Sequence, residues 1–139
     1  MNIFRRMINK RKERKLILEK EKEKLQKLND RRPNRRFNVR GATYNDRQYL
    51  LNNITRRHGY QGIGKIKLVP EPDNKYDPNA IGIIFEDVGH IGYVPKELTE
   101  SIAKFIDKDN FDVKWDIEWF ENERSQEILY MEVRLYTKK

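Results

Sequence analysis

The stretch that decides the fold reads Leu68-Val-Pro-Glu-Pro-Asp-Asn-Lys-Tyr-Asp-Pro-Asn-Ala-Ile81, followed by Gly89-His-Ile-Gly-Tyr-Val-Pro-Lys-Glu-Leu98. Its pattern predicts a strand, a polar turn rich in Asp, Asn and Pro, an uncharged strand, a short turn, another strand and then a helix. The strands are expected at residues 64–69, 80–85 and 90–94. Pro95 suits the start of the helix because it has no N–H to leave unpaired, and the helix carries an apolar stripe of Leu98, Ile102, Phe105 and Ile106.

Upstream of this stretch, period-two alternation begins at Phe37 and predicts a first strand that ends near Tyr44. We expect residues 45–62 to form a less regular polar connection with about one helical turn.

The C-terminal part predicts a hairpin. Apolar residues alternate with charged ones from Phe111 to Trp119, and the alternation repeats from Leu129 to Leu135. We expect Trp115 and Trp119 to face the core, and Phe120 to point outward beside the turn. Antiparallel strands that alternate in this way bury one face. The predicted fold is therefore mainly β with flanking helices: a small OB-like or SH3-like β-barrel, preceded by a basic N-terminal helix.

Charge is distributed unevenly along the 139 residues. Residues 1–36 hold 15 Lys and Arg against 5 Asp and Glu, whereas residues 37–139 hold 15 against 17. We therefore divide the chain into a basic, largely helical extension over 1–36 and a β-barrel domain over 37–139. Within the domain, residues 37–67 carry six basic groups against one acidic group, which predicts a basic face that suits nucleic acid.

Composition excludes several functions. The chain has no cysteine, and His58 and His90 stand far apart without a supporting cluster, so we expect no metal and no cofactor. No nucleophile has a base beside it, so we expect no enzymatic activity. No apolar run is long enough for a membrane span or a secretion signal, and we expect a cytoplasmic protein.

The leader from Ile3 to about Asn29 consists of good helix formers without Gly or Pro, and predicts a solvated helix. A basic linker follows, in which Arg31, Arg32, Arg35 and Arg36 could each neutralise a phosphate. Two other roles remain open. Apolar and basic residues near the start of the helix suit an anionic membrane surface, and the segment also suits a solubilising or partner-binding arm.

The polar loop over 72–79 offers Asp73, Asn74, Asp77 and Asn79 around Tyr76. One interpretation is a turn that needs no ligand, because Asp and Asn bond their own backbone and proline fixes φ. A calcium loop is disfavoured, since the central Gly and the closing Glu of such loops are missing.

The residues of this region also resemble the HIRAN family, small β-rich modules found alone or fused to DNA-remodelling helicases. The resemblance covers roughly Phe37 to Tyr136. The matching residues are Val39, Gly41, Glu71-Pro72, Asn74, Tyr76-Asp77, Asn79-Ala80-Ile81, Ile91-Gly92 and Lys96-Glu97-Leu98.

The resemblance implies a pocket that holds the 3′ end of a single DNA strand. Carried over by position, Asp77 accepts a hydrogen bond from the terminal hydroxyl beside Tyr76, Asn74 lies near the backbone, Lys96 lies close to a phosphate and Tyr44 stacks on a base. The chain departs from the family at Thr43-Tyr44-Asn45, where such modules have Arg-Tyr-Tyr, and at Tyr93, which replaces a histidine. Arg40, Arg47 and Tyr93 are partial substitutes.

The leading hypothesis is a non-catalytic DNA-binding module for single strands or 3′ ends, acting in DNA repair, replication or a mobile element, with a protein partner from a repair or helicase complex. The alternative is a protein-interaction adaptor that has lost the DNA-end pocket.

Overall fold

The computed structural model describes residues 2–108 and 110–138. Its contacts divide the chain into one unit that ends at Arg32 and another that starts at Pro33. The elements in chain order are α1 (Ile3–Asn29), β1 (Arg35–Asn38), α2 (Arg47–His58), β2 (Gln61–Ile63), β3 (Ile66–Pro70), β4 (Ile81–Phe85), β5 (Gly89–Tyr93), the 3-10 turn η1 (Lys96–Leu98), α3 (Thr99–Lys108), β6 (Phe111–Glu121) and β7 (Glu127–Thr137).

The first unit is the helix predicted from its composition. α1 spans 27 residues, and the side chain of Asn2 caps it by accepting from the backbone N–H of Phe4 at 2.7 Å. Its first turn contains no acidic residue. Within the described residues, no helix is long and apolar enough to cross a membrane.

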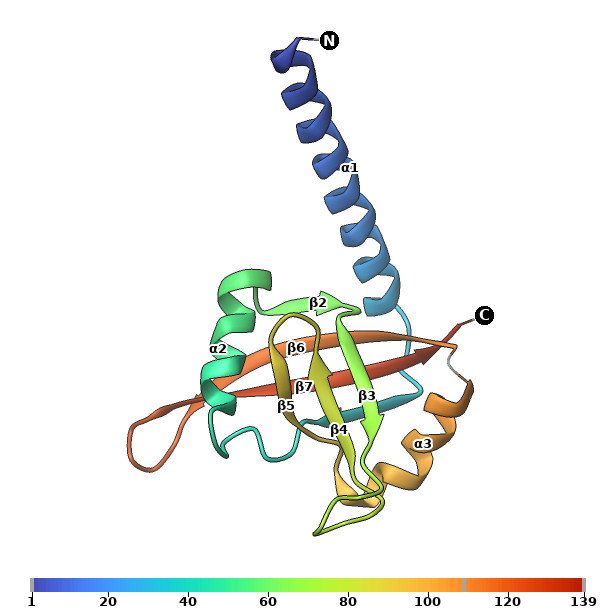
Figure 1. The fold of residues 1–139 in the computed structure, drawn as a ribbon, viewed down its shortest axis with the longest axis vertical. Coiled ribbons are helices and arrows are strands. Elements are labelled where there is room, and N and C mark those ends of the chain that lie inside the picture. Colours follow the sequence, from blue (N-terminus) through green and yellow to red (C-terminus); the bar gives the residue numbers. More distant parts are fainter. Residues whose placement is uncertain (1, 109, 139) are drawn as a thin grey trace. The chain divides into compact units, whose positions relative to one another are not determined.

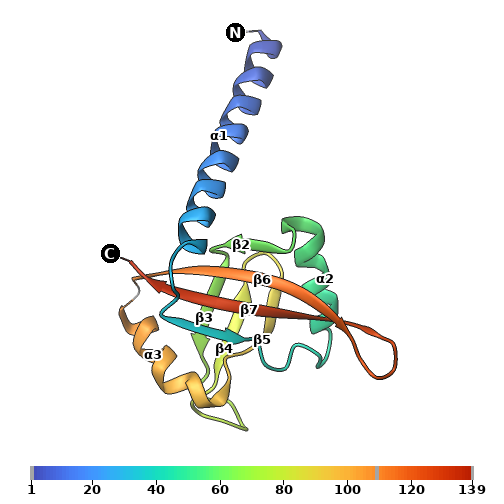
Figure 2. The same ribbon diagram turned by 180° about the vertical axis from the view of Figure 1, so that it is seen from behind.

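The second unit contains two antiparallel sheets. One has the strand order β1-β7-β6-β2, and the other has the order β3-β4-β5. Figures 1 and 2 show the two sheets face to face, with the strands of one running across those of the other, and with α2 and α3 at opposite ends. Apolar side chains from both sheets, α2 and α3 form one core, which includes Leu51, Ile83, Ile102, Trp115 and Val133. Two sheets crossing steeply over one core are a common way for short strands to bury one face each.

The mainly β fold with an N-terminal helix is confirmed, but the closed barrel is not. A single antiparallel bridge, between Arg40 and Tyr93, joins β5 to the segment that follows β1. No strand pairing between described residues joins β2 to β3, so the two sheets do not close into a cylinder.

The strand predicted at 64–69 is wrong in its extent. Gly64 and Lys65 have φ values of 68° and 63°, and this left-handed pair ends β2 and turns the chain toward β3. β2 then pairs with β6 while β3 pairs with β4, so the corner moves the chain from one sheet to the other. The strands at 80–85 and 90–94 and the helix after Pro95 are confirmed to within a residue or a turn.

The connection over 45–62 is the largest error in the predicted secondary structure. It contains the three-turn helix α2, whose Leu51 and Ile54 are fully buried. Leu50, Leu51 and Ile54 have helical spacing, and Gly59 ends the helix at φ 85°. The predicted first strand is also too long, because β1 ends at Asn38 and a turn begins at Gly41.

The C-terminal hairpin is confirmed, with Phe111 paired to Thr137 and Glu121 paired to Glu127. Trp115 is 1% exposed, as predicted, but Trp119 is 59% exposed and does not face the core. The hairpin extends past α2, so its last residues have no layer opposite them (Figure 2). Phe120 is exposed as expected, and its ring lies 5.8 Å from that of Tyr130.

Candidate nucleic-acid interface

All eight residues of the domain that the sequence predicts as DNA contacts line one cleft of about 970 Å³. We call it the Asp77 cleft, and its predicted contacts are Arg40, Tyr44, Arg47, Asn74, Tyr76, Asp77, Tyr93 and Lys96. They come from four places in the fold: the turn after β1, the start of α2, the loop between β3 and β4, and the segment from the end of β5 into η1.

The loop between β3 and β4 presents Asp77 at the cleft. Asn74 Oδ1 accepts from the backbone N–H groups of Tyr76 (2.9 Å) and Asp77 (3.1 Å), and Asp77 Oδ1 accepts from the N–H of Asn79 at 2.9 Å. These Asx turns are the ligand-free turn that the sequence also predicted. These turns use only Oδ1 of the Asp77 carboxylate. Asp77 is partly buried, and its Oδ2 has no hydrogen-bond or ion-pair partner among the described residues. The turn and a ligand site are therefore compatible.

Three cations share the cleft with this carboxylate. Arg47 donates to the carbonyl of Gly41 at 2.8 Å, which fixes its guanidinium over the ring of Tyr93 at 5.2 Å. Arg40 pairs with Glu97 at 3.4 Å, but both side chains are 66% exposed, so the pair contributes little and opens readily. Lys96 is exposed in the first turn after β5. The three cations attract phosphates to this surface, whereas the Asp77 carboxylate repels a phosphate placed directly beside it.

Two tyrosines at the cleft have free faces. Tyr76 is 96% exposed and Tyr44 is 69% exposed. Exposed aromatic rings beside cations are typical of sites where unpaired bases stack. Tyr93 differs, because its ring lies 4.8 Å from that of His90 and under Arg47, and its hydroxyl donates to Glu71. Tyr93 is part of the cleft wall.

Glu71 does not line the cleft but contacts two residues that do, and the sequence predicts no role for it. Its Oε1 accepts from Asn74 Nδ2 and from the hydroxyl of Tyr93, each at 3.1 Å, while Oε2 lies 2.9 Å from His90 Nε2. Partial burial raises the pKa of the Glu71 carboxyl, but the hydrogen bonds from His90, Asn74 and Tyr93 outweigh burial. The pKa of Glu71 therefore lies below its ordinary value of 4.5.

Two glycines make room for this arrangement. A Cβ on Gly82 would collide with Glu71 Oε2 and would lie 2.8 Å from His90 Nε2. Gly92 has a φ of 150°, and a Cβ there would collide with the backbone oxygen of Arg40. The short approach at Gly92 permits the bridge that brings Arg40 beside Tyr93.

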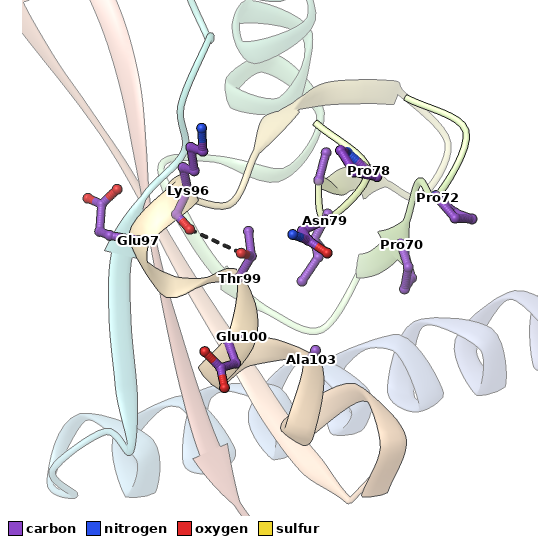
Figure 3. A pocket seen from close by; sticks show the side chains of 11 residues that line it. Pro70, Pro72, Pro78, Asn79, Lys96, Glu97, Thr99, Glu100 and Ala103 are labelled. Carbon is purple, nitrogen blue, oxygen red and sulfur yellow. Dashed lines mark hydrogen bonds between the residues drawn. The ribbon is translucent and has the colours of Figure 1, made fainter. Parts of the chain in front are cut away.

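A second cleft of about 580 Å³ is lined by residues of the same loop and of the segment from η1 into α3. It shares Ala80, Lys96 and Glu97 with the Asp77 cleft. Figure 3 shows Lys96 and Glu97 projecting away from the prolines of the rim, and the hydroxyl of Thr99 donating to the carbonyl of Lys96 at 3.0 Å. Glu97 and Glu100 outnumber Lys96 in its lining, so this second cleft is less favourable for phosphate.

The sequence predicts a linker that contains Arg31, Arg32, Arg35 and Arg36, but the last two lie in a strand. Arg35 and Arg36 are the first residues of β1 and pair with Leu135 and Arg134 of β7. Arg35 lies 5.3 Å over the ring of Phe105, and Arg36 is 4.0 Å from Glu132. Both side chains remain exposed. Arg31 and Arg32 belong to the unit that contains α1.

The described residues contain no group of three or more His, Cys, Asp or Glu side chains that could hold a metal ion.

Comparison with known proteins gives one family and two solved structures. The model of the HIRAN domain matches residues 36–138. A crystal structure of a protein from Lactobacillus plantarum is 22% identical, with a TM-score of 0.44, over 73% of this chain and 91% of that one. A crystal structure of the HIRAN domain of human HLTF is 19% identical, with a TM-score of 0.40, over 75% of this chain and 76% of that one. No curated protein matches the sequence.

Proposed function

The chain belongs to the HIRAN domain family, and from this premise we propose that it binds single-stranded DNA at the 3′ end, without catalysing a reaction. The observation that carries the proposal is the gathering of eight predicted contacts around one cleft, where an available carboxylate oxygen of Asp77 stands beside three cations. The residues come from segments far apart in the chain, so their meeting does not follow from any local turn.

End selection follows from the charge of Asp77. A terminal 3′ hydroxyl can donate to Oδ2, and a hydrogen bond to a charged group contributes about 1.5–3 kcal/mol. A phosphate in the same place has no proton to donate at neutral pH and is repelled by the carboxylate. The difference corresponds to about tenfold or more in affinity. Arg40, Arg47 and Lys96 hold the internal phosphates that precede the terminal nucleotide.

Stacking supplies affinity that does not depend on sequence. Tyr44 and Tyr76 present exposed rings at the cleft, and a base stacked on an aromatic side chain is worth about 1–3 kcal/mol. The strand leaves the cleft past Arg40 and Tyr44, because Glu97 and Glu100 make the second cleft unfavourable for phosphates.

The leader adds phosphate contacts without base readout. Residues 5–12 of α1 contain Arg5, Arg6, Lys10, Arg11 and Lys12 and no acidic residue. Cations near a helix N-terminus repel one another and are repelled by the positive end of the helix dipole. A bound phosphate relieves both repulsions. Arg31 and Arg32 extend this basic segment, and Arg35 and Arg36 extend it onto the first strand.

We propose that the domain is a partly open form of a small OB-like or SH3-like barrel, in which the Arg40–Tyr93 bridge joins the two sheets along one edge. The process that it serves is DNA repair, replication or a mobile element, in the cytoplasm and beside a protein partner. The exposed Trp119 and Phe120 at the hairpin tip favour such a partner, and they also favour the second candidate function, an adaptor that binds protein alone.

A fluorescence anisotropy titration decides between the two functions. Short labelled strands of one sequence carry a free 3′ hydroxyl, a 3′ phosphate or a 5′ phosphate with a free 3′ end. The proposal predicts about tenfold weaker binding for the 3′ phosphate and equal binding for the two free 3′ ends. Equal affinity for all three strands would contradict selection of the 3′ end. No binding to any strand at low salt would favour the protein-binding adaptor.

A further inference from the structure

We infer that Glu71 is a positioning residue whose carboxylate ties together the two walls of the Asp77 cleft. The inference deepens the proposed function and rests on it for its effect on DNA, but the link between the walls is a property of the free protein. Glu71 is partly buried, with 27% of its side chain exposed, and it lies outside the lining of the cleft. It therefore acts through other residues.

The first wall is the loop that carries Tyr76 and Asp77. Glu71 Oε1 accepts from the Asn74 amide at 3.1 Å, and this fixes which way the amide faces. The Asn74 oxygen then faces the backbone N–H groups of Tyr76 and Asp77 and accepts from both. An unbroken series of hydrogen bonds thus runs from Glu71 to the backbone of the end-reading residue.

The second wall contains Tyr93, whose hydroxyl donates to the same oxygen of Glu71 at 3.1 Å. The backbone N–H and C=O of Tyr93 pair with those of Arg40, both at 2.8 Å. The ring of Tyr93 supports the Arg47 guanidinium. Glu71 Oε1 therefore contacts both walls of the cleft. Through Tyr93 it supports the wall that positions Arg40 and Arg47, and through Asn74 it supports the loop that positions Asp77.

His90 fixes the orientation of Glu71 itself. Its Nδ1 is buried and has no hydrogen-bond partner among the described residues, so a proton on Nδ1 would be unsatisfied. The favoured tautomer carries its proton on Nε2 and donates it to Glu71 Oε2 at 2.9 Å. This bond leaves Oε1 for the two walls. Gly82 provides the space for the pair, because a side chain there would collide with it.

Amide hydrogen exchange measured by NMR tests the link without DNA. In Glu71→Ala, the amides of Tyr76 and Asp77 exchange at least about tenfold faster, because Asn74 is free to turn away. Glu71→Gln keeps a side-chain oxygen for Asn74 and Tyr93 when His90 moves its proton to Nδ1 and accepts from the new NH₂ group, so exchange stays within about threefold of the unmodified protein. Glu71→Asp keeps the charge but is too short to reach both walls, and it gives an increase even if the alanine variant fails to fold.

The matched control is Asp87→Asn, which alters another carboxylate and histidine pair. Asp87 lies 3.3 Å from His58 Nε2 in the turn between β4 and β5, and neither residue lines the Asp77 cleft. The substitution leaves the exchange of Tyr76 and Asp77 unchanged. Exchange that stays unchanged in both Glu71→Ala and Glu71→Asp overturns the inference, as does an equal increase in the control.

The titration with 3′-hydroxyl and 3′-phosphate strands gives the second readout. Glu71→Ala reduces the ratio of the two affinities at least about threefold, while Glu71→Gln restores it to within about twofold of the unmodified protein. A residue that only stabilises the fold would lower both affinities together. If the unmodified protein shows no end preference, the proposed function fails while the exchange data still decide the role of Glu71. A preserved ratio in Glu71→Ala contradicts the inference.

Discussion

At the scale of single residues, the site depends on side chains that each satisfy more than one partner. Asp77 accepts from the backbone of Asn79 through one oxygen and keeps the other available. The family resemblance predicts Asp77 and its neighbours as contacts, whereas turn chemistry predicts only the loop that carries them. Neither predicts the role of Glu71, since Tyr93 and His90 lie 22 and 19 residues away and meet it only through the pairing of β3, β4 and β5.

The depressed pKa of Glu71 predicts a pH dependence of stability. The folded state favours the carboxylate, so the contribution of Glu71 is fully present above its ordinary pKa of 4.5 and is lost as the pH falls through the lower pKa of the folded state. The difference in free energy of unfolding between the unmodified protein and Glu71→Gln is therefore constant from pH 7 to 5. It shrinks in urea titrations as the pH falls below 4.5 and through the lower pKa of the folded state, whereas a difference that grows on acidification contradicts the assignment.

The exposed tyrosines predict the affinity for single strands. Tyr44→Ala and Tyr76→Ala each weaken binding by about 1–3 kcal/mol, or about tenfold to a hundredfold, because each removes a stacking surface. The loss is the same for strands with a 3′ hydroxyl and with a 3′ phosphate. Tyr49→Ala changes an exposed tyrosine of α2 outside the Asp77 cleft and is the control in the same anisotropy assay. If Tyr49→Ala lowered the affinity equally, Tyr44 and Tyr76 would have no specific role in binding the strand.

At the scale of elements, periodicity predicts the hairpin of β6 and β7 but not where its burial ends. Alternation assigns Trp115 and Trp119 to one face, yet Trp115 is 1% exposed and Trp119 is 59% exposed. Similarly, α2 has few apolar residues, so its pattern is weak although Leu51 and Ile54 are fully buried. The corner at Gly64-Lys65 was missed because an isolated sequence gives no signal for a strand that changes sheet. These features depend on which elements pack together.

The hairpin gives a stability prediction. Trp115→Ala lowers the free energy of unfolding by about 3–5 kcal/mol, because it empties the core between the sheets. Trp119→Ala costs less than about 1 kcal/mol, because the ring is already 59% exposed. Denaturant unfolding followed by circular dichroism measures both values. Equal losses would mean that the hairpin tip is packed against another part of the protein.

At the scale of the whole molecule, charge divides the chain between a basic helical unit and a nearly neutral domain. The boundary observed in the contacts follows Arg32, so a truncation that removes residues 1–32 leaves β1 and its pairing with β7 intact. The truncated protein keeps its end preference and shows a weaker salt dependence. The slope of log K against log salt falls by about 0.7 for each phosphate contact that the leader made to a single strand. An unchanged slope would assign those contacts to the domain.

The central claim is that the charge of Asp77 reads the end of the strand, and Asp77→Asn tests it most directly. Asparagine keeps the oxygen that accepts from Asn79, so the loop retains its turn while the available oxygen becomes an NH₂ group. We expect the preference for a 3′ hydroxyl over a 3′ phosphate to fall from about tenfold to less than about twofold, because the hydroxyl loses its acceptor while the phosphate is no longer repelled. A preference that survives Asp77→Asn unchanged would contradict the account.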